Sequence, residues 1–132
     1  MTYGSAAYEV TRDRWSGVAI EVSHSPRHRE NIARMIDAAK KSLAYHSANL
    51  SSYQHRSLRV VEFPRYVRDG MSLPAMIALS ESTGFDARVD GAESIDFPFY
   101  ITAHEVAHQW WGQQLVAANV QGAAVLHETL AQ

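Results

Sequence analysis

The stretch His104-Glu105-Val106-Ala107-His108 places two histidines four positions apart with a glutamate directly after the first, and the rest of the chain is organised around it. Residues four apart in an α-helix lie on the same face, so both imidazoles can bind one metal ion. In an H-E-x-x-H pattern the ion is zinc, which activates a water molecule, and the glutamate accepts the proton of that water. The stretch therefore predicts His104 and His108 as zinc ligands and Glu105 as the general base.

This arrangement requires a helix, and the residues upstream provide a start for one. Asp96 is a suitable N-cap, and Pro98 suits the first helical turn. Apolar residues surround much of the segment, as in a helix buried in a core, and Trp110 and Trp111 are among them. We expect this helix to run to about residue 115.

A catalytic zinc usually has three protein ligands, so a third must come from another element. Residues 123–132 predict a second helix, which carries His127 and Glu128. Adjacent helical residues point about 100° apart, so only one of the two can face the metal. His46 and His55 are weaker candidates, because a lone histidine on a helix end or loop is more often a surface or core residue.

Composition limits the class of protein. The chain has 132 residues, 46% of them hydrophobic, which is enough for one domain with a core. The net charge is −2 and the basic residues are scattered, so neither nucleic acid nor an anionic membrane is implied as a partner. Without cysteine, histidines and carboxylates must hold any zinc. No signal peptide or run of transmembrane length is present, so we expect the chain as given to be soluble.

Hydrophobic periodicity predicts an α+β fold. The expected strands are residues 15–22, 57–63 and 74–80. A helical pattern covers residues 26–46, with Ser25 as its cap and Pro26 in its first position. The apolar face of that helix is Ile32, Met35, Ile36, Ala39 and Leu43.

The segments around the third strand predict mainly loops. Asp69-Gly70 is a turn signal, and residues 82–95 are interpreted as a loop with a short strand near 87–89. The strand from residue 74 begins with proline, which suits an edge strand, and an edge beside a metal site can pair with an extended peptide. The alternative is a strand that only completes the sheet.

The run 104–132, HEVAHQWWGQQLVAANVQGAAVLHETLAQ, resembles the zinc site of aminopeptidase N-type gluzincin metallopeptidases. In that family, H-E-x-x-H-x-W-x-G is followed one helix later by a Leu-x-Glu segment whose glutamate is the third ligand. The matching residues are Trp110, Gly112, Leu126 and Glu128. The family's gap of eighteen residues falls on His127, whereas Glu128 needs a gap of nineteen. The resemblance implies Glu128, because one extra loop residue costs little and rotating the helix would displace its apolar face.

A second segment, MIALSESTGF at residues 76–85, lies where this family carries its G-x-M-E-N strand. Glu81 occupies the place of the glutamate that binds the free amino group of the substrate. From Trp15 onward the chain resembles peptidase domains fused to bacterial transporter permease segments. The resemblance implies a parent protein at the bacterial inner membrane, with a helical domain and a catalytic tyrosine beyond Gln132.

These inferences together predict a single domain over residues 1–132, the truncated N-terminal part of a thermolysin-like, zincin catalytic domain. It should have a small mixed or antiparallel sheet, one long helix and two zinc-binding helices. The implied function is that of a zinc metallo-aminopeptidase with one Zn²⁺ and a peptide substrate with a free N-terminus, weak in isolation without the tyrosine. One alternative is a zinc-binding structural or regulatory module without turnover. Another is a metal-free helical interaction domain that uses Trp110 and Trp111 as a binding patch.

Overall fold

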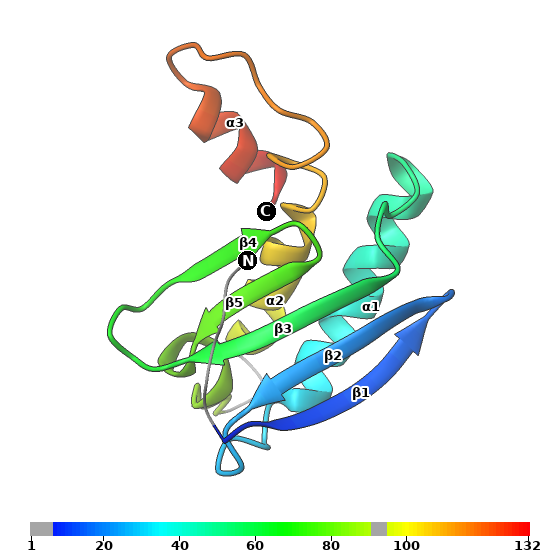
Figure 1. Cartoon of the computed structure of the whole chain (residues 1–132). Helices are drawn as coiled ribbons and strands as arrows, with labels where there is room; N and C mark the ends of the chain where they lie inside the picture. The colour runs from blue at the N-terminus through cyan, green and yellow to red at the C-terminus, as the bar shows by residue number, and fades with distance from the viewer. Residues whose placement is uncertain (1–6, 91–94) are drawn as a thin grey trace.

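The computed structural model describes residues 7–90 and 95–132. The described elements, in chain order, are β1 (Glu9–Trp15), β2 (Val18–His24), α1 (Ile32–Asn49), β3 (Ser57–Phe63), β4 (Gly70–Leu73), β5 (Met76–Ser80), the π-helical turn η1 (Glu81–Phe85), α2 (Phe97–Ala107) and α3 (Ala123–Leu130). The strands form one five-stranded sheet in the order β1-β2-β3-β5-β4 (Figure 1). The neighbours β2, β3 and β5 run parallel, while β1 and β4 are antiparallel edge strands, so the sheet is mixed.

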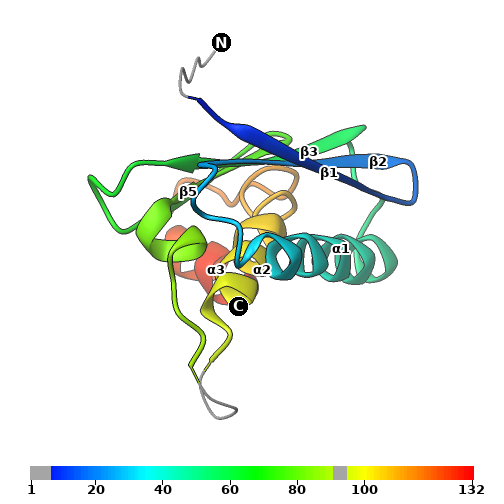
Figure 2. The same ribbon diagram turned by 90° about the horizontal axis from the view of Figure 1, so that it is seen from below.

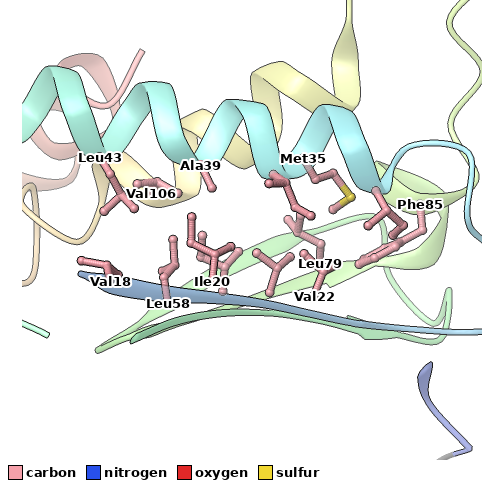
Figure 3. Close-up of a cluster of buried hydrophobic side chains, with 14 of the residues drawn as sticks. Val18, Ile20, Val22, Met35, Ala39, Leu43, Leu58, Leu79, Phe85 and Val106 are labelled. Carbon is pink, nitrogen blue, oxygen red and sulfur yellow. The ribbon is translucent and has the colours of Figure 1, made fainter. Parts of the chain in front are cut away.

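Helices cover one face of this sheet, as the view from below shows (Figure 2). Alternate residues of β2 and β3 point into the core because side chains of a strand alternate between its two faces. The fully buried positions on these strands are Ile20, Val22, Leu58 and Val60. They meet α1, whose predicted apolar face is confirmed: Ile32, Met35, Ile36, Ala39 and Leu43 are all buried (Figure 3).

Two predicted helix starts have different outcomes. The Asp96 cap of α2 is confirmed, since its carboxylate accepts a hydrogen bond from the backbone N–H of Phe99 at 3.1 Å. The prediction that Ser25 caps α1 is wrong, because α1 begins only after Asn31. The Asn31 side chain instead donates to the carbonyls of Gly84 and Phe85, and this ties the start of α1 to η1.

The strand predicted over residues 15–22 corresponds mainly to β2, and a hairpin joins β2 to β1, which the sequence did not predict. Trp15 ends β1 rather than starting the strand that follows it. Ser16 and Gly17 form the turn with φ of 41° and 88°, and two successive positive φ values are typical of a type I′ hairpin turn. In β1 half-buried and exposed residues alternate, as expected for an edge strand with one face toward solvent.

The edge of the sheet is not where the sequence predicted it. The strand expected as an edge, β5, lies between β3 and β4. The Asp69-Gly70 signal leads directly into the true edge strand, β4, which is only four residues long. A two-residue loop with Ala75 at a φ of 61° joins β4 to β5.

The helix carrying the H-E-x-x-H stretch is shorter than predicted. It ends at Ala107, where the N–H groups of Gln109 and Trp110 bond to carbonyls three residues earlier and tighten the last turn. Gly112 then takes a left-handed φ of 102° and turns the chain back. The short strand predicted near residues 87–89 is absent from the described part of the chain. Within that part, no helix combines the length and apolar character that a bilayer span needs.

Candidate metal centre

Three predicted ligands lie together at the C-terminal end of α2 and on α3. The Nε2 atoms of His104 and His108 are 3.1 Å apart. One carboxylate oxygen of Glu128 lies 3.3 Å from Nε2 of His104, and the other lies 3.6 Å from Nε2 of His108. Figure 1 shows α3 beyond the end of α2. The chain therefore brings two imidazoles and one carboxylate to a single point.

These separations fit one zinc ion. Zinc binds histidine nitrogen and carboxylate oxygen at about 2.0–2.2 Å, and tetrahedral ligands at such bond lengths lie about 3.3–3.6 Å from one another. The Nε2–Nε2 separation of 3.1 Å, and the distances of 3.3 and 3.6 Å at which two different oxygens of Glu128 approach the two histidines, lie within about 0.2 Å of that range. Two histidines and one carboxylate are also the donor set of a known class of catalytic zinc site, which keeps a fourth position open.

The ring of His108 has a hydrogen-bond partner that favours the metal-binding tautomer, whereas Nδ1 of His104 is buried without a partner among the described residues. The Nδ1 atom of His108 lies 3.0 Å from the backbone carbonyl of Trp111, so a proton on Nδ1 can be donated there and Nε2 keeps its lone pair. Burial lowers the pKa of His104, and the neighbouring His108 lowers it further, against the opposing effect of the Glu128 charge. A lowered pKa favours neutral imidazole, which is the ligand form.

Glu105 lies on the same helix, with a side chain that is almost completely buried. Burial raises the pKa of its carboxyl group to about 7, and the charges of Glu128 and Asp69 raise it too, while His108 opposes them. A carboxyl group with a pKa near neutrality can both accept and return a proton at physiological pH. This is the property expected of the predicted general base.

His127, the alternative third ligand, points elsewhere. Its Nε2 atom lies 3.1 Å from the backbone nitrogen of Ala117 and accepts the hydrogen bond of that N–H. His127 thus fastens α3 to the loop that precedes it, while Glu128 on the next helical position faces the two histidines. The weaker candidate His46 is also occupied, since it stacks on the buried Trp110 with ring centroids 5.1 Å apart.

A cleft of about 500 Å³ opens beside the three ligands. Its lining includes Asp69, Gly70 and Ser72 from the loop and edge strand, and Trp111 and Gln113 from the turn after α2. The backbone of Gly70 approaches Glu105 so closely that a Cβ atom at residue 70 would lie 2.5 Å from Oε1 of Glu105. The predicted base therefore sits directly against the edge strand.

The structure does not bring Glu81, the predicted amine-binding residue, to this cleft. Its carboxylate accepts hydrogen bonds from the backbone N–H and the Nε of Arg65, at 3.2 and 2.9 Å, and these lower its pKa. Its other neighbours are His28 and the buried Glu62, whose side chains are hydrogen-bonded to each other. These residues follow or end the three parallel strands, so the network joins the carboxyl ends of those strands.

Several residues of the cleft were not predicted from the sequence. The strand β4, which contains Gly70 and Ser72, is too short to show a hydrophobic period. The turn signal Asp69-Gly70 was the one sequence feature that indicated this region. Trp111 was interpreted as core or as a binding patch, yet it is half-buried and lines the cleft, unlike the fully buried Trp110. Gln113 carried no signal that could have placed it there.

Comparison with known proteins adds no identification. Because neither a protein-family model nor a curated protein matches the chain, its resemblance to aminopeptidase N-type gluzincins remains a prediction.

Proposed function

We propose that this protein is a zinc-dependent metallopeptidase of the aminopeptidase type. The observation that carries the proposal is the convergence of His104, His108 and Glu128 at separations that suit a single zinc ion. The buried Glu105 lies beside them with a raised pKa. An H-E-x-x-H helix with a carboxylate from a following helix provides both a metal site and a proton acceptor.

His104, His108 and Glu128 would hold the zinc ion, which would polarise the scissile carbonyl and lower the pKa of a water molecule. Glu105 takes the proton from that water and returns it to the leaving amine. The carbonyl of Trp111 holds the ring of His108 in place, and the buried surroundings of His104 keep its imidazole neutral. Each of these roles belongs to a residue whose position and partners are defined.

A peptide is the substrate class that the cleft favours. β4 is an antiparallel edge strand, and an extended peptide can add to such an edge through backbone hydrogen bonds. The edge passes directly over Glu105 at Gly70. A peptide paired with β4 would therefore pass the general base with its own backbone, which places peptide bonds near the reacting groups.

The preference for a free N-terminus comes from the resemblance, and we assign it to a different carboxylate. Glu81 pairs with Arg65, outside the cleft. Asp69 lines the cleft, and its charge contributes to the raised pKa of Glu105, so it lies within electrostatic reach of the reacting groups. We propose that Asp69 attracts the ammonium group of the substrate.

The second candidate function is a zinc-binding module without turnover. The observation that favours it is the exposure of α3: no residue of this helix is buried, and the Glu128 side chain is 63% exposed. A ligand on such an exposed helix can hold zinc, but the helix leaves the open side of the cleft in contact with water. Water exclusion strengthens the electrostatic effects on which catalysis depends.

Metal analysis and an activity assay on two proteins separate these functions. Zinc content is measured by emission spectroscopy on the wild type and on Glu105→Gln, and both are assayed with alanine and leucine nitroanilides, with a chelator control. The enzyme requires zinc in both proteins and chelator-sensitive turnover in the wild type alone. The module predicts zinc in both and turnover in neither. Absence of stoichiometric zinc from the wild type overturns both.

A further inference from the structure

The edge strand β4 presents its polar backbone groups in an alternating pattern. In an antiparallel pair, consecutive residues direct their N–H and C=O groups alternately toward the partner strand and away from it. The carbonyl of Asp69 accepts a hydrogen bond from the N–H of Ser80 at 3.0 Å, so Asp69 faces β5. The backbone groups of Gly70 and Ser72 consequently face away from β5, and both residues line the metal cleft.

Two side chains already occupy part of this outward edge. Gln113 donates a hydrogen bond from Nε2 to the carbonyl of Ser72 at 3.0 Å. At the other end, the Asp69 carboxylate accepts one from the N–H of Gly70 at 2.9 Å. Within residues 7–90 and 95–132, no other hydrogen bond reaches the two remaining outward groups, the carbonyl of Gly70 and the N–H of Ser72. One acceptor and one donor two residues apart can pair with a single residue of an extended chain.

The turn that carries Gln113 also hydrogen-bonds to β4 through a second glutamine, and this supports the position of Gln113. Gln109 is almost completely buried, and its Nε2 donates to Oγ of Ser72 at 2.6 Å and to the carbonyl of Leu73 at 2.9 Å. Its Oε1 accepts from the N–H of Ala75 at 2.9 Å. These hydrogen bonds tie the turn after α2 to the edge strand, next to the carbonyl of Ser72 that accepts the bond from Gln113.

We propose that Gln113 is a specificity-determining residue, which ends the pairing edge of β4 at Ser72 and restricts the cleft to one substrate residue along that edge. This inference rests on the proposed function and narrows its substrate class to short peptides or chain ends. A long peptide passing through the cleft would have to displace Gln113 from the Ser72 carbonyl to gain a further backbone hydrogen bond.

The test measures binding, so it does not depend on turnover. The zinc-loaded chain is titrated calorimetrically with a single-residue hydroxamate and with two three-residue hydroxamates, extended to the N-terminal or the C-terminal side of the zinc-binding group. In the wild type we expect the extra residues to add little affinity. In Gln113→Ala one of the longer ligands should gain about three- to tenfold, the value of one hydrogen bond, while the single-residue ligand is unchanged.

Gln114→Ala is the matched control, because the Gln114 side chain accepts a hydrogen bond from Oγ of Ser51 at 2.8 Å instead of contacting β4. Gln113→Met, which keeps the length of the side chain but has no N–H, should show the same gain as Gln113→Ala and serves if the alanine variant does not fold. This inference alone is overturned if Gln113→Ala and Gln113→Met bind both longer ligands with wild-type affinity. It is also overturned if Gln114→Ala shows an equal gain in affinity. A wild-type chain that binds no zinc overturns the proposed function and this inference with it.

Discussion

Replacing Glu128 by alanine should weaken zinc binding far more than replacing its neighbour His127. The carboxylate oxygens of Glu128 lie 3.3 and 3.6 Å from the Nε2 atoms of the two histidines, which is the spacing of ligands on one ion. His127 is bonded to the N–H of Ala117 and has no part in that cluster. The two variants therefore separate a ligand from a residue that only anchors its helix.

The expected losses of zinc affinity in Glu128→Ala and His127→Ala differ by more than an order of magnitude. Structural zinc sites contribute about 10–16 kcal/mol, so one of three or four ligands is worth about 3–4 kcal/mol. Loss of Glu128 should then reduce the zinc affinity by about 10²- to 10³-fold. Loss of the His127 hydrogen bond removes about 0.5–1.5 kcal/mol of support for α3, which corresponds to about tenfold or less.

A competition titration against a chromophoric chelator measures both variants on one scale. His127→Gln is the matched control, because an amide oxygen can accept the hydrogen bond of Ala117 and should restore wild-type affinity. If His127→Ala lost as much affinity as Glu128→Ala, or more, the assignment of the third ligand would be refuted.

The remaining predictions concern Glu105 and the glycine beside it. Glu105→Gln should keep its zinc and lose most turnover, because the amide cannot accept a proton; loss of the metal, measured by emission spectroscopy, would make Glu105 a ligand instead. Because burial raises the pKa of Glu105 from 4.5 to about 7, the folded chain holds a proton that the unfolded chain releases, so its contribution to stability falls as the pH rises between these values. At pH 8 in the presence of chelator, the free energy of unfolding measured with urea should therefore be higher for Glu105→Gln than for the wild type, by about 3 kcal/mol. Equal urea curves at pH 5 and pH 8 for both proteins would contradict this. Gly70→Ala places a methyl group 2.5 Å from Oε1 of Glu105, so the carboxylate must retreat by about 0.9 Å, and turnover should drop about 100-fold with zinc retained. The control is Gly84→Ala, whose methyl meets the flexible end of Met35 at 3.2 Å; equal turnover in both variants would contradict the proposed contact.

Local spacing predicted that the side chains of His104 and His108 meet, because this depends on helix geometry alone. His104 and His108 are one helical turn apart, and their Nε2 atoms meet although the helix itself ends at Ala107. The apolar face of α1 was predicted for the same reason, since its period is set within one segment. The choice of Glu128 over His127 agrees with the contacts of the two side chains.

Features that depend on pairing between distant segments were not predictable in this way. Which strand forms an edge is decided by its neighbours in space, and β4 has only four residues with which to show a pattern. Its turn places Ala75 at a φ of 61°, which sequence rules reserve for glycine or asparagine. Glu81 follows β5 at the expected distance from the zinc helix, but its side chain points toward Arg65.

The position of the ligands along the chain sets an order of assembly. The predicted ligands His104, His108 and Glu128 all follow β5, so a ribosome releases the described sheet and α1 before these residues. α3 buries no residue of its own, and therefore it gains little from docking in the absence of metal. We expect zinc to bind only after the sheet has formed, so that metal-starved cells would accumulate a chain with its sheet formed and α3 undocked.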